Sequence, residues 1–280
     1  MNLRGAGILA LGVALWWAGD AAASVRNEGS SQFPAVQIAQ FAKRVEKRLA
    51  ESGARVAVVS RVGRPPDELP PGVRYTRVGL AVYSAITTKD GRRLPGYAMY
   101  NLYQDEKQPD RSELVQDYPV DFFAGVYALE AGIVVPKPTL QQRVLKMIRD
   151  GSYRRLHNPH YSVLANPYKT RFQNCTGFVL DVLVGALYRT GDIAQIETDI
   201  KAYFRAQPIA VDPLKLALGS LLRGELALSD QQGPVRTATY ESLVAFMREH
   251  GLSQEVLTVT DRAKTNRAAP LTREAARAPG

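Results

Sequence analysis

Cys175, the only cysteine of this 280-residue chain, stands between a polar turn and a strongly apolar segment, in the stretch RFQNCTGFVLDVLVGALYRTG (171–191). A thiol at the first turn of a helix meets unpaired backbone N–H groups and the positive end of the helix dipole, and both favour the thiolate. The amides of Gln173 and Asn174 could cap this helix or donate hydrogen bonds to an oxyanion. Cys175 is therefore a candidate nucleophile. The alternative is a small buried apolar side chain, the commoner role of a lone cysteine.

A thiol nucleophile needs a general base, normally a histidine that a third polar group orients. His157 and His160, in the motif HNPH, lie in the loop that leads to Cys175 and are the candidate bases. The alternative is a turn in which the imidazoles hydrogen-bond to backbone carbonyls. Two histidines three residues apart are at most half of a metal site, and with no cysteine pair or acidic cluster nearby we predict no metal. Without a glycine-rich phosphate loop or a dinucleotide fingerprint, we also predict no cofactor.

The N-terminus predicts export from the cytoplasm. Arg4 supplies a positive charge, an apolar run follows over residues 6–18, and small alanines end the segment. This order is typical of a secretory signal, and the run is short for a membrane span. We predict a signal peptide over residues 1–23 with cleavage after Ala23, a polar leader over 24–32, no later transmembrane span and a periplasmic or secreted protein. An uncleaved anchor is the alternative.

The formal net charge of +9 narrows the class of partner. Outside the cytoplasm nucleic acid is a poor candidate, so the positive charge favours anionic envelope surfaces or acidic substrates. Ordinary solubilising surface charge is the alternative. Hydrophobic residues make up 45% of the chain and charged residues 22%, which is typical of a globular protein. We predict an envelope peptide, glycan or lipid as the partner, and no nucleic acid.

The expected secondary structure is that of an α+β protein. Apolar residues at three- and four-residue spacing predict a helix at the start of the mature chain, and period-two alternation predicts strands after it. Helical patterns return after Pro138. The expected strands are 54–63, 75–86 and 96–104, with short extended pieces at DYPVDFFAG and AGIVVPKP, and the expected helices are 34–52, 139–151, the one from Cys175, 192–206, 212–223 and 239–250.

These elements predict a small antiparallel sheet packed on a central helix that bears Cys175, with extra N- and C-terminal helices, in one domain over residues 33–260. Residues 261–280 lack periodicity and are predicted to be a disordered basic tail. Along the expected strand 75–86, alternation places Val78 and its alternates on one face of the sheet, and Arg77 and its alternates on the other.

Several motifs in order, VAVVSRVGR, YTRVGLAVY, YNLYQ, LVQDYPVDFF, HNPHYSVLANPY and QNCT, resemble an exported proteobacterial family catalogued as a domain of unknown function (family 2145). The resemblance covers roughly residues 35–250. The order of a β-meander and then QNCT is also distantly similar to the permuted NlpC-type papain-like cysteine hydrolases. That likeness implies a permuted papain-like fold, in which a His-x-Gly strand precedes the cysteine helix.

One departure from the papain-like pattern concerns Arg77, which occupies the position where the resemblance implies the catalytic histidine. Arginine stays protonated and cannot act as a general base, but it could hold a thiolate or a substrate carboxylate. Tyr100 and Asn101 are expected on the neighbouring strand, where the third member of the triad would lie, and Asn101 is our choice for it.

The first functional hypothesis is a thiol hydrolase or transferase that acts on amide or ester bonds in the cell envelope. Cys175 would be the nucleophile, and His157 or His160 the base. The second is a non-catalytic binding protein that uses Arg77 as its anchor, and the third is a scaffold protein that uses its basic surface. Arg77 separates the first two hypotheses, because hydrolysis requires a histidine within hydrogen-bond reach of the sulfur and arginine cannot replace it as the base.

Overall fold

The computed structural model describes residues 32–87, 90–210, 227–261 and 266–267. The predicted signal peptide, nearly all of the polar leader, the predicted helix 212–223 and most of the predicted tail lie outside the described residues. No helix in the described part of the chain is long and apolar enough to cross a membrane.

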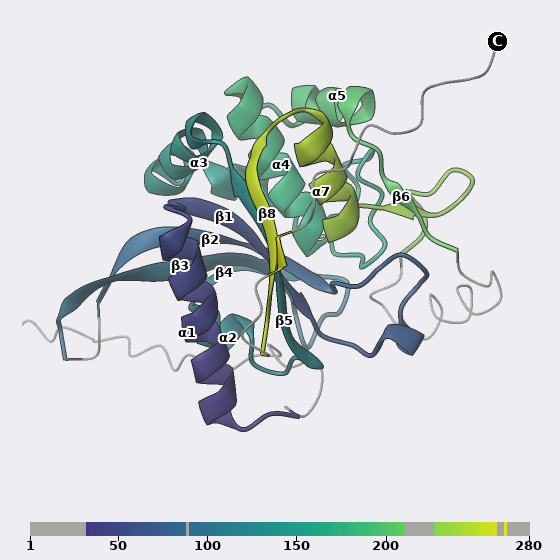
Figure 1. The fold of residues 1–280 in the computed structure, drawn as a ribbon. Coiled ribbons are helices and arrows are strands. Elements are labelled where there is room, and N and C mark those ends of the chain that lie inside the picture. The colour runs from purple at the N-terminus through teal and green to yellow at the C-terminus, as the bar shows by residue number, and fades with distance from the viewer. Residues whose placement is uncertain (1–31, 88–89, 211–226, 262–265, 268–280) are drawn as a thin grey trace, which may run out of the picture.

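Within the described residues, seven strands form one antiparallel sheet through the middle of the molecule (Figure 1). Their order is β4-β3-β2-β1-β5-β8-β9, so the first four strands form a meander that β5 and β8 extend beyond β1. The predicted antiparallel sheet is confirmed, and it is larger than expected because C-terminal strands join it. The strands are β1 (Val56–Val62), β2 (Arg77–Thr87), β3 (Arg93–Gln104), β4 (Ser112–Asp117), β5 (Ala128–Pro136), β8 (Ser253–Thr260) and β9 (Asn266–Arg267), and a separate pair is formed by β6 (Gln207–Pro208) and β7 (Arg236–Thr237).

Helices cover both faces of the sheet (Figure 1). The α1-side core lies between the sheet and helices α1 (Ala35–Glu51) and α2 (Pro119–Phe122). The α4-side core lies between the opposite face and the remaining helices. These are α3 (Pro138–Asp150), α4 (Cys175–Tyr188), α5 (Ile193–Tyr203) and α7 (Tyr240–Glu249), and two short 3-10 helices are η1 (Pro66–Glu68) and η2 (Ser152–Leu156). The structure is therefore of the predicted α+β class.

The alternation of β2 assigns its side chains to these two cores. Val78, Leu80 and Val82 belong to the α4-side core, whereas Ala81 belongs to the α1-side core. Successive strand residues point to opposite faces, so Arg77 shares the face of Ala81. The sequence predicted this alternation correctly, and the packing of α4 decides which face holds the candidate nucleophile.

Helix α4 begins at Cys175 and packs against β2 and β3. Apolar side chains surround almost its whole circumference, as expected for a helix that lies between a sheet and other helices. It ends at Tyr188, and the next residue, Arg189, caps it in the left-handed conformation (φ 57°).

One local prediction was wrong, and two strands were not expected from the sequence. DYPVDFFAG, expected to be extended, contains the end of β4 and the short helix α2, because Pro119 fits a first helical position and Asp121 accepts a hydrogen bond from the backbone N–H of Tyr118 at 3.2 Å. No strand was expected between residues 250 and 261, where β8 pairs with β5. From the tail that was expected to be disordered, Asn266 and Arg267 pair with β8 as β9.

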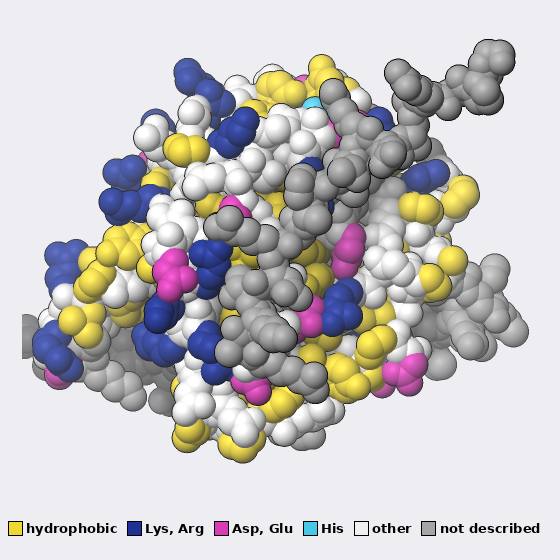
Figure 2. Space-filling model, viewed as in Figure 1, with side chains coloured by type: hydrophobic (Ala, Val, Ile, Leu, Met, Phe, Trp, Pro, Cys, Tyr) yellow, Lys and Arg dark blue, Asp and Glu magenta, His cyan; other side chains and the backbone are white. Residues whose placement is uncertain are grey.

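The basic stripe of α1, interpreted from the sequence as solvated, is partly paired. Lys and Arg side chains gather over this helix on the visible surface (Figure 2). Arg48 forms an ion pair with Glu255 of β8 at 2.5 Å, and Arg44 pairs with Asp261. These contacts attach α1 to β8 and to the residue that follows β8, in addition to the packing of the apolar face of α1 on the sheet.

Candidate functional site

Cys175 is the first residue of α4, with 7% of its surface exposed, and it belongs to the α4-side core. Among the described residues, its sulfur has one hydrogen-bond contact, with the Thr176 hydroxyl at 4.0 Å. No histidine of the described chain lies within hydrogen-bond reach of the sulfur. The geometry therefore matches a small buried side chain more closely than a nucleophile with its base.

Asn174 caps α4, as one of the two sequence interpretations predicted. Its Oδ1 accepts a hydrogen bond from the backbone N–H of Gly177 at 2.7 Å. Its Nδ2 donates to the Val163 carbonyl and to the Thr237 hydroxyl, both at 3.0 Å. Both amide hydrogens are thereby used within the fold, so this side chain offers no donor to an oxyanion.

Gln173 is also fully engaged. Its Nε2 donates to the Leu156 carbonyl at 2.9 Å and to Oδ2 of Asp181 at 2.6 Å. Its Oε1 accepts from the backbone N–H of Asn158 at 2.9 Å. The amide group is buried and joins the HNPH loop to α4, which is a structural and positioning role rather than oxyanion stabilisation.

In the described chain neither imidazole of HNPH hydrogen-bonds to a backbone carbonyl, so the hydrogen bonds differ from those of the turn interpretation. His157 is half-buried, and its Nε2 lies 3.1 Å from the hydroxyl of Ser112 on β4. Burial lowers the pKa of His157, so its ring favours the neutral form. His160 is exposed and joins Arg111 through an isolated β-bridge. Neither ring hydrogen-bonds to the sulfur of Cys175.

Arg77 lies on the wrong side of the sheet for the predicted role beside Cys175. It is 5% exposed, and its guanidinium lies 4.6 Å from the ring centroid of Tyr103 and 3.4 Å from the Leu102 carbonyl oxygen, to which it donates. Tyr103 in turn donates to Asp117 at 2.8 Å. This buried polar cluster lies on the face of the α1-side core, so the sheet separates it from the thiol.

The two other residues predicted on this strand point to opposite faces of the sheet. Asn101 donates to Asp117 at 2.7 Å and belongs to the buried polar cluster, on the face of the sheet away from Cys175. Tyr100 faces the α4-side core, where its ring contacts Tyr153, which contacts Phe178 of α4. Tyr100 thus packs toward the cysteine helix, but its contacts are aromatic.

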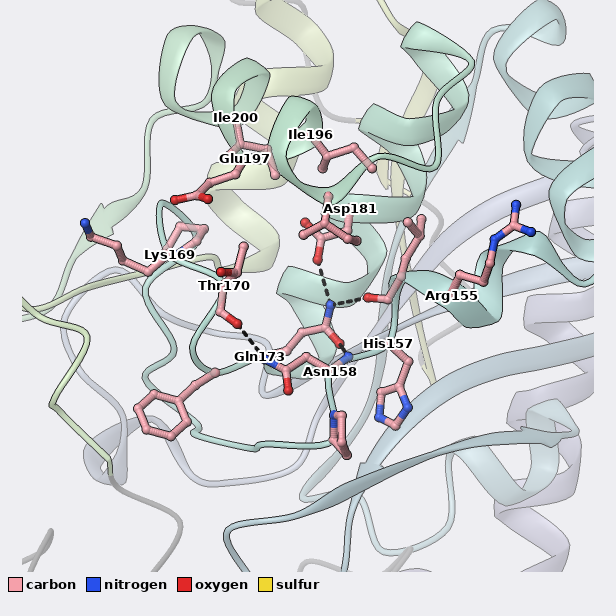
Figure 3. Close-up of a pocket in the computed structure, with 15 residues that line it drawn as sticks. Arg155, His157, Asn158, Lys169, Thr170, Gln173, Asp181, Ile196, Glu197 and Ile200 are labelled. Atoms are coloured by element: carbon pink, nitrogen blue, oxygen red, sulfur yellow. Dashed lines mark hydrogen bonds between the residues drawn. The ribbon is translucent and has the colours of Figure 1, made fainter.

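A pocket of about 240 Å³ opens beside α4, between the HNPH loop, the loop before Cys175 and α5 (Figure 3). We call it the Asp181 pocket. Isoleucines of α5 form its apolar wall, and polar groups gather on the opposite side. Its lining consists of Arg155, Leu156, His157, Asn158, Pro159, Pro167, Lys169, Thr170, Phe172, Gln173, Asp181, Ile193, Ile196, Glu197 and Ile200.

Asp181 is the central polar group of this pocket. One carboxylate oxygen accepts from Gln173, and the other makes no hydrogen bond within the described chain. Part of the side chain is accessible from the pocket, yet the surrounding protein excludes most water. Burial raises the pKa of Asp181 to about 7, and the hydrogen bond from Gln173 opposes part of that rise. A carboxyl group near its pKa at neutral pH is a common feature of functional sites.

Sequence reasoning missed Asp181, although a signal existed. It is the one charged residue within the apolar run FVLDVLVGAL, and a charge on a buried helix needs a reason. It follows Cys175 by six residues, about one and two-thirds helical turns, so the two side chains face different directions. The pocket and the thiol are therefore separate features of α4.

Among the described residues, no group of three or more His, Cys, Asp or Glu side chains could hold a metal ion.

A family model described as an uncharacterized protein conserved in bacteria, DUF2145, matches residues 48–247. Searches of the curated proteins and of the solved structures gave no match.

Proposed function

We propose that this chain, which belongs to the bacterial family DUF2145, is a non-catalytic binding protein of the cell envelope that holds a small ligand in the Asp181 pocket. The observation that carries the proposal is the open carboxylate oxygen of Asp181 at the wall of a preformed cavity. Ligand sites combine an apolar wall with a few fixed polar groups, and this pocket has both.

The hydrogen bonds around Cys175 support binding over catalysis. Hydrolysis through a thiol needs a base near the sulfur and free donors for the oxyanion. The sulfur contacts Thr176, and the amides of Gln173 and Asn174 are satisfied by the fold. Both predicted oxyanion donors therefore have structural roles, and neither amide is left for a reacting carbonyl.

The proposal includes distant kinship with the permuted papain-like hydrolases. In support, a helix that starts at Cys175 packs against an antiparallel sheet, the arrangement that the resemblance implies. In this chain the position of the expected histidine faces away from that helix. The envelope location rests on the signal-like N-terminus.

Ligand-observed NMR tests the pocket directly. A panel of small amines, amides, sugars and dipeptides would be screened by saturation transfer against the natural protein and two variants. Ile193, which is 37% exposed, lies at the rim of the pocket. Ile193→Trp should place an indole across the entrance and remove the signals of the bound compounds. Ile193→Val keeps an aliphatic rim and should retain them.

Two outcomes would overturn the proposal. Compounds that bind equally well to Ile193→Trp would place the binding site elsewhere on the protein. Repeated turnover of p-nitrophenyl acetate that disappears in Cys175→Ala would show that the thiol is catalytic. A panel with no bound member at millimolar concentration would also count against a small-ligand pocket.

A further inference from the structure

We propose that the ligand group held by Asp181 is a primary ammonium on an aliphatic stem. This inference rests on the proposed binding function and specifies the chemistry of its ligand. It follows from three features of the pocket. The carboxylate is held in position, it has no partner cation in the described chain, and the cavity beside the apolar wall has room for one chain of side-chain size.

The carboxylate of Asp181 is held in place before any ligand arrives. Gln173 donates to it at 2.6 Å, and Gln173 is itself held by the carbonyl of Leu156 and the backbone N–H of Asn158 (Figure 3). Asn158 is anchored further by donating to the Thr170 carbonyl at 2.7 Å. A fixed acceptor costs a ligand less entropy on binding than a mobile one.

The cations nearest the pocket do not neutralise this carboxylate. In the described chain, no lysine, arginine or histidine forms an ion pair with Asp181. The side chains of Arg155 and Lys169 extend away from it (Figure 3). Glu197, the second acid of the lining, already pairs with Lys201 at 2.5 Å. A partly desolvated carboxylate without a counter-ion is stabilised by a ligand that carries a positive charge.

The apolar wall sets the size and shape of the stem. Ile193, Ile196 and Ile200 lie on one side of α5, and Leu156 adds to the same cavity. Its volume of about 240 Å³ lies below the roughly 300–1,000 Å³ typical of sites for drug-sized ligands. The space fits one chain of side-chain size, such as an alkylamine or a lysine-like group, and excludes a larger ring system.

The raised pKa of Asp181 gives the interaction a pH signature. An ammonium near the lysine value of about 10.4 stays charged up to pH 9, so the carboxyl group controls binding at lower pH. With a pKa of about 7, the ionised fraction of Asp181 is about 3% at pH 5.5 and about 90% at pH 8. Because only the ionised form attracts the cation, affinity for the ammonium should rise about 30-fold between these two pH values.

The experiment compares n-pentylamine with 1-pentanol, a neutral probe of similar shape, by titration of backbone amide NMR shifts at pH 5.5 and 8. Pentylammonium should bind in the Asp181 pocket at least tenfold more tightly than pentanol at pH 8 and lose most of that advantage at pH 5.5. Asp181→Asn keeps an acceptor for Gln173 and should abolish the preference. Glu249→Gln, which removes a surface carboxylate paired with Arg205, should retain it.

The outcomes separate this inference from the proposed function. Equal binding of the two probes, or a preference that survives Asp181→Asn, would refute the ammonium inference and leave a functioning pocket. Absence of pentylammonium binding at both pH values would also refute it, whatever other compounds the wider panel finds. If that panel also yields no pocket ligand, the proposed function fails with it.

Discussion

Replacing Arg77 by histidine should destabilise the protein without activating Cys175. The permuted papain-like pattern implies the opposite, because it places a histidine here as the base. In the structure Arg77 is buried on the α1-side face, against the ring of Tyr103. The imidazole of Arg77→His would face that same side, with the sheet between it and the sulfur.

The cost can be worked from the contacts that disappear. A desolvated cation over an aromatic ring contributes about 2 kcal/mol, here from Arg77 on Tyr103. The variant also loses the hydrogen bond that the guanidinium donates to the Leu102 carbonyl, at about 1 kcal/mol. We therefore expect a loss of about 3 kcal/mol in the free energy of unfolding. Domains are typically stable by about 5–15 kcal/mol, so the variant should still fold.

Urea unfolding at pH 8, where the new histidine is neutral, measures this loss. Arg77→Lys is the matched control, because it keeps the charge but not the planar guanidinium, and it should lose less stability. Acylation of Cys175 by p-nitrophenyl acetate across pH measures the chemistry in the same proteins. A loss below 1 kcal/mol in Arg77→His would refute the packing argument. Acylation that rises in Arg77→His with a midpoint near the ordinary histidine value of about 6.5 would refute the placement.

Two further predictions concern buried groups on the α4 side of the sheet. The pKa of Asp181 is raised from about 3.8 to about 7 in the folded state, so the folded protein binds more protons between these values and stability should fall as pH rises through that window. In Asp181→Asn the free energy of unfolding should fall by about 2–4 kcal/mol less over this window than in the natural protein. Urea titrations at pH 4, 6 and 8 measure the difference, and a variant whose pH profile matches the natural protein would contradict the assignment. Gln141 accepts from the backbone N–H groups of Arg55 and Val56 at 2.7 and 3.0 Å and donates to the Pro136 carbonyl at 2.7 Å. Gln141→Leu leaves these groups unpaired and should lower the free energy of unfolding by about 2–4 kcal/mol in urea titrations, and a loss below 1 kcal/mol would contradict this role.

The sequence alone determined what depends on neighbours within a few residues. The Asn174 cap joins residues three apart, and Gly151 ends α3 in the left-handed conformation that its missing Cβ permits (φ 75°). Period-two alternation along β2 correctly separated Val78 from Arg77, because the pleat of a strand is a local property. The α+β class and the antiparallel meander followed from such patterns.

Only the tertiary structure decided which face of the sheet meets α4, and with it the fate of the predicted site. The amides of Gln173 and Asn174 are taken by groups from distant segments, among them Leu156 and Thr237. The Asp181 pocket likewise needs α5 and two loops to close around one carboxylate. Hydrogen-bond partners and cavities join residues far apart in the chain, and no local periodicity encodes which of them will meet. Residue types could therefore nominate Cys175 and Arg77, but packing placed them on opposite faces and left Asp181 open to a ligand.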